Sequence, residues 1–129
     1  MKIKKIFLYW LVLIIQSCTS DYNKYLGKGY FYRDEGGEIK DILCERPNGK
    51  EIPATILDYV YNDEYIIAKQ KPKLPQDPLY KEEYEYHYGE ESLYFWIIIK
   101  KKDIIFGPMN KIEFANKIKK LGINLKFEK

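Results

Sequence analysis

Few side chains in this sequence can support acid–base or nucleophilic catalysis. His87 is the only histidine, and Cys18 and Cys44 are the only cysteines. A zinc site built from histidine and cysteine needs several ligands at a regular spacing, which this chain lacks. Beyond residue 20 the only hydroxyl side chains of serine or threonine are Thr55 and Ser92, and neither lies in a nucleophile-elbow motif. The sequence therefore predicts no metal, no cofactor and no catalytic residue.

Adjacent acidic residues support an alternative hypothesis, in which the protein is an enzyme. Glu82-Glu83 and Glu90-Glu91 share the segment 71–92 with His87, and paired carboxylates can cleave glycosidic bonds. The rival is therefore an envelope hydrolase that uses acidic residues and His87 of this segment. Neighbouring carboxylates in an acidic loop are more often solvated charge, so we favour a protein that is not an enzyme.

Tyrosines in the same segment are the candidate binding residues, namely Tyr80, Tyr84, Tyr86 and Tyr88. In an extended conformation the last three share one face, because side chains alternate along a strand. Such a row of rings could bind a peptide or a glycan, since tyrosine offers rigid contact area. The alternative, which we favour, is that this stretch extends the sheet and its rings cover the core, as aromatic residues in strands commonly do.

The first seventeen residues have the pattern of a secretion signal. Three lysines precede the apolar run 6–15, which is shorter than the ~20 residues that span a bilayer. The end of this run, Ile15-Gln16-Ser17-Cys18, resembles the lipobox of bacterial lipoproteins, with Gln16 as an unusual third residue. The resemblance implies cleavage before Cys18 and a diacylglyceryl thioether on its sulfur. An ordinary secretion signal with an incidental cysteine is the alternative.

Removal of residues 1–17 would leave a neutral chain. The whole chain has 22 basic and 19 acidic residues, and the first seventeen contain three lysines and no acid, so residues 18–129 have 19 of each. Nucleic-acid binding needs a basic surface, so no nucleic-acid partner is expected. The run Lys100-Lys101-Lys102 could touch anionic headgroups, although a lysine-rich turn is the simpler interpretation. Cys44 is predicted to be a buried apolar side chain without a disulfide.

The rest of the chain predicts a short tether, 18–24, and a single β-rich domain, 25–129. Segments rich in β-branched and aromatic residues, separated by turn sequences, predict antiparallel strands at 25–33, 38–45, 54–61, 64–70, 93–100 and 104–106. The apolar sequence of 93–100 predicts a strand covered on both faces. Three prolines exclude helix and central strand from the first half of 71–92, and so long a loop is usually functional or disordered.

A helix is predicted after Asn110. Asn110 and Glu113 have the spacing of a capping box, and Gly122 suits the C-cap. The predicted apolar stripe consists of Ile112, Phe114, Ala115, Ile118 and Leu121. Residues 123–127 are predicted to return as an edge strand.

These elements resemble a family of small bacterial lipoproteins of unknown function. The matching sequences are Tyr65-Ile66-Ile67-Ala68, Tyr94-Phe95-Trp96-Ile97-Ile98, Ile105-Phe106-Gly107-Pro108, Glu113-Phe114 and Leu121-Gly122-Ile123. The likeness covers roughly residues 25–125 and is specific in the last third. Ile99-Lys100 stands where the family often has an aspartate. The resemblance implies the architecture and no activity.

Together these patterns predict an α+β fold that is mostly β, with an antiparallel meander sheet of five to seven strands and one C-terminal helix. We expect a lipoprotein of the cell membrane or outer membrane, held by lipid on Cys18 outside the cytoplasm. Its predicted role is non-enzymatic binding of an envelope protein, peptide or glycan. A structural subunit of an envelope complex is the further alternative.

Overall fold

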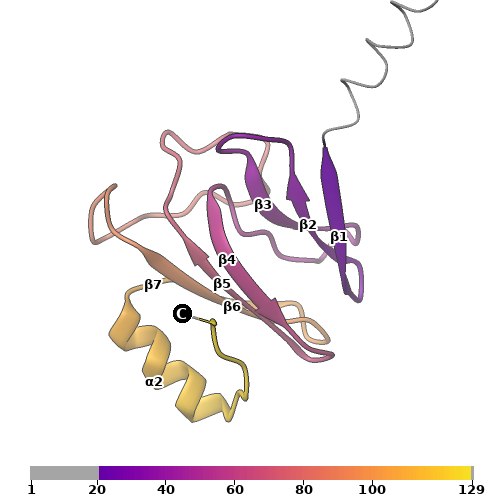
Figure 1. Ribbon diagram of the computed structural model, residues 1–129, viewed down its shortest axis with the longest axis vertical. Helices are drawn as coiled ribbons and strands as arrows, with labels where there is room; N and C mark the ends of the chain where they lie inside the picture. The colour runs from indigo at the N-terminus through magenta and orange to yellow at the C-terminus, as the bar shows by residue number, and fades with distance from the viewer. Residues whose placement is uncertain (1–20, 129) are drawn as a thin grey trace, which may run out of the picture.

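The computed structural model describes residues 21–128, so the predicted signal peptide and Cys18 lie outside the described residues. Within this range seven strands form two antiparallel sheets, and one α-helix follows the last strand (Figure 1). The predicted class, α+β and mostly β with a C-terminal helix, is confirmed. No helix within this range is long and apolar enough to cross a membrane.

Each sheet is a meander in which neighbours along the chain are neighbours in the sheet. The smaller sheet consists of β1 (Tyr22–Gly27), β2 (Tyr30–Asp34) and β3 (Lys40–Cys44). The larger sheet consists of β4 (Ile56–Tyr61), β5 (Tyr65–Gln70), β6 (Tyr94–Ile99) and β7 (Ile104–Met109). The helix, α2, spans Lys111–Leu121.

The single predicted meander is therefore divided into two sheets. The division falls in the segment 45–55, which contains Pro47 and Pro53 and forms one isolated bridge, between Ile52 and Ile42 of β3. Proline has no backbone N–H to donate to a ladder, so pairing does not continue from β3 to β4. The two sheets instead pack face to face around a shared core.

The N-terminal strand prediction was wrong in its boundaries. Residues 25–33 are two strands, because Gly27, Lys28 and Gly29 all have positive φ, at 99°, 53° and 86°. Two glycines make this conformation accessible, and the chain reverses there. β1 also begins at Tyr22, so part of the predicted tether, residues 22–24, belongs to the sheet.

The larger sheet is covered on both faces, as the apolar sequence of 93–100 predicts. Trp96 and Ile98 of β6 belong to the core between the two sheets, whereas Ile97 belongs to the core beneath α2. In β5, Ile66 faces the first core and Ile67 the second. Alternation along a strand sends successive side chains to opposite faces, so one apolar run supplies both cores.

The helix has the predicted caps. The Asn110 side chain accepts from the Glu113 backbone N–H, the Glu113 carboxylate accepts from the Asn110 N–H, and Gly122 ends the helix at φ 65°. Ile112 was wrongly assigned to the packed stripe, because its side chain is 72% exposed. Leu121 does pack toward the sheet.

The predicted edge strand at 123–127 is absent from the described structure. Residues 123–128 follow α2 as an extended segment outside both sheets. Ile123, Leu125 and Phe127 pack against the face of the larger sheet that α2 also covers. Their alternate spacing, which is typical of a strand, serves here to lay one apolar face of the segment over the sheet.

Candidate functional site

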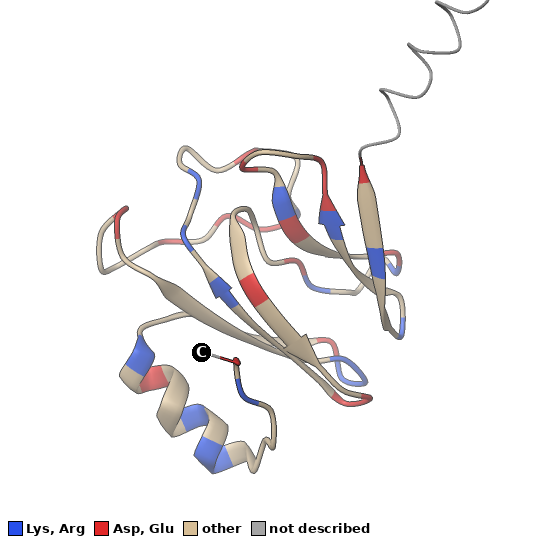
Figure 2. Ribbon diagram, in the orientation of Figure 1, with Lys and Arg blue, Asp and Glu red and all other residues tan. Residues whose placement is uncertain are grey.

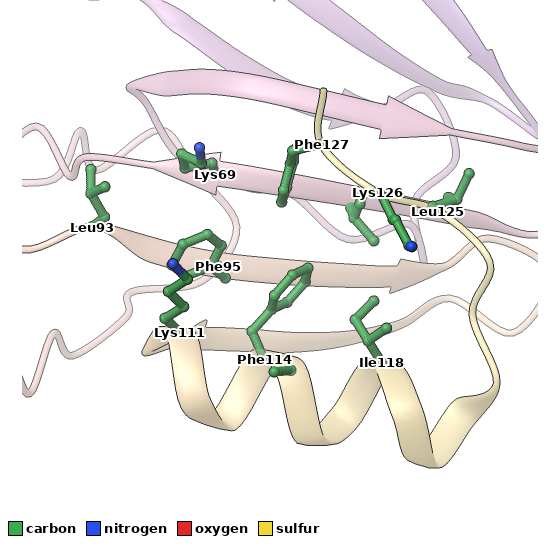
Figure 3. A pocket seen from close by; sticks show the side chains of 11 residues that line it. Lys69, Leu93, Phe95, Lys111, Phe114, Ile118, Leu125, Lys126 and Phe127 are labelled. Carbon is green, nitrogen blue, oxygen red and sulfur yellow. The ribbon is translucent and has the colours of Figure 1, made fainter. Parts of the chain in front are cut away.

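A groove of about 480 Å³ runs between α2, the segment 122–128 and the outer face of the larger sheet (Figure 3). This volume lies within the ~300–1,000 Å³ that small-molecule sites occupy. Most of its lining side chains are apolar, and the three polar ones are lysines. The apolar ones are Ile67, Leu93, Phe95, Phe114, Ala115, Ile118, Leu125 and Phe127, and the lysines are Lys69, Lys111 and Lys126.

Helical and extended spacing bring these side chains together. In α2, Lys111, Phe114 and Ile118 follow one another at intervals of three and four, which places them on one face of the helix. On the opposite wall Leu125 and Phe127 are two residues apart in extended chain, and both pack against the core beneath α2. The walls therefore belong to two consecutive segments of the chain.

Three phenylalanine rings lie next to one another in the groove. The Phe95 and Phe114 centroids are 5.0 Å apart with the planes at 25°, and Phe127 lies 5.8 Å from Phe114 and 6.2 Å from Phe95. No residue of α2 is fully buried, so the helix covers the sheet without sealing it. The rings form apolar walls that are partly open to solvent.

The lysines lie at the ends of the groove. Lys69 and Lys111 lie toward the end near Leu93, on either side of Phe95, and Lys126 lies toward the other end (Figure 3). The Lys69 Nζ is 5.2 Å from the centroid of Phe127. None of these three ammonium groups forms an ion pair with the residues of 21–128.

The segment 111–126 is basic, although the described chain is not. Residues 21–128 contain 18 basic and 19 acidic residues, whereas residues 111–126 contain five lysines and one acid, Glu113 (Figure 2). The Glu113 carboxylate is occupied, because it accepts from the Asn110 N–H at 2.9 Å and from the Tyr88 hydroxyl at 3.0 Å. The groove therefore offers positive charge to an anionic ligand.

The candidate tyrosines of 71–92 do not form one exposed row. The Tyr84 ring packs edge-on against Trp96 at 4.8 Å, and Tyr86 packs against Tyr94 at 4.9 Å. The Tyr86 hydroxyl accepts from Gln70 Nε2 at 3.0 Å, and burial raises the pKa of Tyr86 to about 12. These two rings pack against the core between the sheets, as the favoured alternative expected. Residues 71–92 form no strand, however, so the segment does not extend the sheet.

Tyr80 and Tyr88 have different surroundings. The Tyr80 hydroxyl donates to Asp41 Oδ2 at 2.5 Å and accepts from the Ala54 N–H at 3.2 Å. Burial raises the pKa of Tyr80. Its hydrogen bond to Asp41 connects the loop to β3. Tyr88 is 46% exposed, and its hydroxyl reaches Glu113 in α2.

The groups of the rival hydrolase hypothesis lie on the surface. His87 is exposed, Glu82 lies 3.5 Å from the Lys50 ammonium, and Glu91 lies 2.9 Å from that of Lys71. Between residues 21 and 128 no group of histidine, cysteine or acidic side chains could hold a metal ion.

Two ion pairs between arginine and aspartate connect elements of the fold. Asp41 is fully buried and accepts two hydrogen bonds from Arg33, at 3.0 and 2.6 Å. Asp103, between β6 and β7, accepts two hydrogen bonds of 2.6 Å from Arg46, and the guanidinium lowers the pKa of Asp103. The second pair ties the larger sheet to the turn that follows the smaller one.

The prediction of an exposed lysine run at 100–102 was wrong for Lys100, which is buried. Its side chain is 2% exposed, and its Nζ donates to the carbonyl oxygens of Leu26 and Asn62, both at 2.5 Å. Burial lowers the pKa of Lys100. Cys44 is buried with a free thiol, as predicted.

A strip of four tyrosines, exposed at its two ends, was not singled out from the sequence. The rings of Tyr22, Tyr32, Tyr59 and Tyr61 are consecutive neighbours, with centroids 6.2, 4.5 and 6.5 Å apart. Tyr22 is 50% and Tyr61 36% exposed. The strip joins β1 and β2 to β4, so only the packing of the two sheets brings its members together.

The groove was also missed in the sequence, although two residues point to it. Lys69 interrupts the apolar alternation of β5 on the face that α2 covers. Lys111 places a cation at the first position of a helix, where an anion is favoured.

Residues 34–129 match the model of a protein family described as being of unknown function, DUF3997. No curated protein and no solved structure matches the chain.

Proposed function

We propose, for a chain that belongs to the DUF3997 family of proteins of unknown function, that it is an envelope lipoprotein whose domain binds an acyl chain without catalysis. The groove carries this proposal, because eight apolar side chains line a volume of about 480 Å³. Burial of each methylene of a ligand contributes ~0.8 kcal/mol. An extended alkyl chain gains most from a long apolar groove of this kind.

An acyl chain suits this groove better than a protein segment does. The walls are rings and branched side chains from α2 and 122–128, and the floor strands β5 and β6 are paired on both sides within their sheet. A protein strand added to a sheet needs a free edge for its backbone hydrogen bonds. An alkyl chain has no polar groups to satisfy, so apolar walls suffice for it.

The envelope location rests on the lipobox-like sequence before Cys18. β1 begins four residues after Cys18, a distance of at most ~14 Å in extended chain. A lipid on that cysteine would hold the β1 end of the domain near the membrane. α2 lies at the other end of the domain in Figure 1, so in this arrangement the groove stays clear of the anchor.

A second candidate function is recognition of a glycan or peptide by the strip of Tyr22, Tyr32, Tyr59 and Tyr61. It is favoured by the exposure of Tyr22 and Tyr61 at the ends of the strip and by the contact area that stacked tyrosines provide. We place it second because Tyr32, in the middle of the strip, is only 8% exposed and offers a ligand little contact area.

The test is photolabelling of the full chain in its native membranes with a neutral diazirine-bearing dodecanol. Ala115→Trp should block the groove, because Ala115 lines it, and should abolish labelling. Asn116→Trp is the matched control, since the neighbouring Asn116 is exposed and does not line the groove. Equal labelling of both variants would contradict the proposal.

A further inference from the structure

We propose that the groove selects a single-chain amphiphile with an anionic head, whose carboxylate or phosphate binds Lys69 and Lys111. This inference rests on the proposed function, since it names the head group that accompanies the bound chain. Its basis is the placement of two unpaired cations at one end of an apolar groove.

Lys111 is a basic residue at a helix position that favours acidic residues. It is the first residue of α2, where the partial positive charge of the helix end favours an acidic side chain. An anion at this end would be attracted both by the lysine and by the helix end. The same charges that disfavour Lys111 in the free protein therefore favour a bound anion.

Lys69 provides the second cation from the opposite side. Its neighbour on the same face of β5 is Ile67, which is fully buried beneath α2. The stem of Lys69 lines the groove while its Nζ lies over the Phe127 ring at 5.2 Å, as expected of a lysine that keeps its charge near solvent. Placed on either side of Phe95 (Figure 3), the two lysines can flank one head group.

The groove has no negatively charged side chain that would attract a cationic head group. No acidic side chain lines it, and the nearby Glu113 is engaged by the helix cap and by Tyr88. A cationic head would meet only lysines, and a neutral alcohol would gain no charge–charge attraction from them. Charge complementarity therefore separates anionic amphiphiles from neutral or cationic ones of equal chain length.

The experiment compares two photoprobes on the full chain in native membranes, a diazirine-bearing dodecanoate and the neutral dodecanol of the same length. The quantity measured is the ratio of anionic to neutral label on the groove peptides, relative to wild type. Lys111→Glu should lower this ratio about fivefold, the effect of losing one partly exposed charge pair, and Lys69→Met should act in the same direction. Added salt should lower anionic labelling alone.

The controls separate head-group recognition from folding. Lys102→Glu makes the same charge change in the exposed turn between β6 and β7 and should leave the ratio unchanged. Lys111→Glu should not lower the thermal midpoint, since an acid suits that helix position. Competition by unlabelled dodecanoate and dodecyl phosphate, compared at equal concentration, distinguishes a carboxylate from a phosphate head.

Two results would overturn the inference in distinguishable ways. If wild type takes up the neutral label in the groove and Lys111→Glu and Lys69→Met leave the ratio unchanged, the chain binds but the head group is not recognised. If the neutral probe does not label the groove of wild type at all, the proposed function itself fails, and this inference fails with it.

Discussion

The Phe114 ring of α2 stacks on the Phe95 ring of β6, with centroids 5.0 Å apart and planes inclined by 25°. Together with Phe127, this pair spaces the helix and the C-terminal segment over the sheet. Because no residue of α2 is fully buried, the interface keeps an open apolar volume. The groove thus follows from large rings at a lightly packed helix.

The helix that forms one wall should depend on its cap. Asn110→Ala should lower the free energy of unfolding by ~1 kcal/mol, because the Glu113 N–H loses its acceptor. Denaturant unfolding followed by circular dichroism measures this change. Asn116→Ala, at an exposed position in the same helix, should not destabilise the protein, and equal losses in both variants would refute the role of the cap.

The tyrosines of the 71–92 loop should differ in their effect on stability. Tyr84→Ser and Tyr86→Ser should each lower the free energy of unfolding by ~2–3 kcal/mol, because each ring packs against an aromatic residue at the core. Tyr88→Ser should leave the unfolding midpoint near that of wild type, since its ring is half exposed. Similar midpoints for all three variants would contradict the packing described for the loop.

Alkaline pH should destabilise the protein through its buried tyrosines. Burial raises the pKa of Tyr59 and Tyr86 to about 12, against ~10 in an unfolded chain. Between these values the unfolded state loses protons that the folded state keeps, so the free energy of unfolding falls as pH rises. The contribution is fully present below pH ~10 and is lost as pH rises toward 12.

Denaturant unfolding at pH ~9 and ~11, with tyrosinate absorbance recorded in parallel, tests this dependence. Tyr86→Phe should reduce the fall in stability between the two values, because the variant lacks one of the titrating hydroxyls. A free energy of unfolding that stays constant over this range would rule out the assignment.

Membrane attachment should require Cys18. In Cys18→Ala the signal should remain uncleaved, whereas wild-type protein should lose residues 1–17 and gain acyl mass. Intact-mass spectrometry of protein from washed membranes measures both. A processed wild-type chain without lipid would show that 1–17 is an ordinary secretion signal.

Local sequence patterns predicted the elements of the fold well. The continuous apolar run of β6 indicated burial on both faces, and the capping box at Asn110 located the start of α2. One wrong prediction came from an overlooked local turn, at Gly27-Lys28-Gly29, and another from longer-range packing. Residues 123–127 alternate like a strand, yet their apolar side chains are buried on a sheet face, which needs no pairing at an edge.

The candidate site was less accessible to sequence reasoning. For Tyr84 and Tyr86 the sequence favoured a place against the core over an exposed row, and the positions of Trp96 and Tyr94 decide between the two. The groove joins residues from β5, β6, α2 and the C-terminal segment, so no local pattern contains it. Lys69 was visible as a charge on an otherwise apolar face, but the sequence does not show what lies opposite.

The most direct test of the account maps where diazirine-bearing dodecanoate attaches to the full chain in native membranes, by sequencing the labelled peptides. We predict attachment to the groove residues of α2 and 122–128, such as Phe114, Ile118 and Leu125, and to β5 and β6 beneath them. Attachment confined to the tyrosine strip of β1, β2 and β4, or to the loop 71–92, would contradict the groove as the binding site.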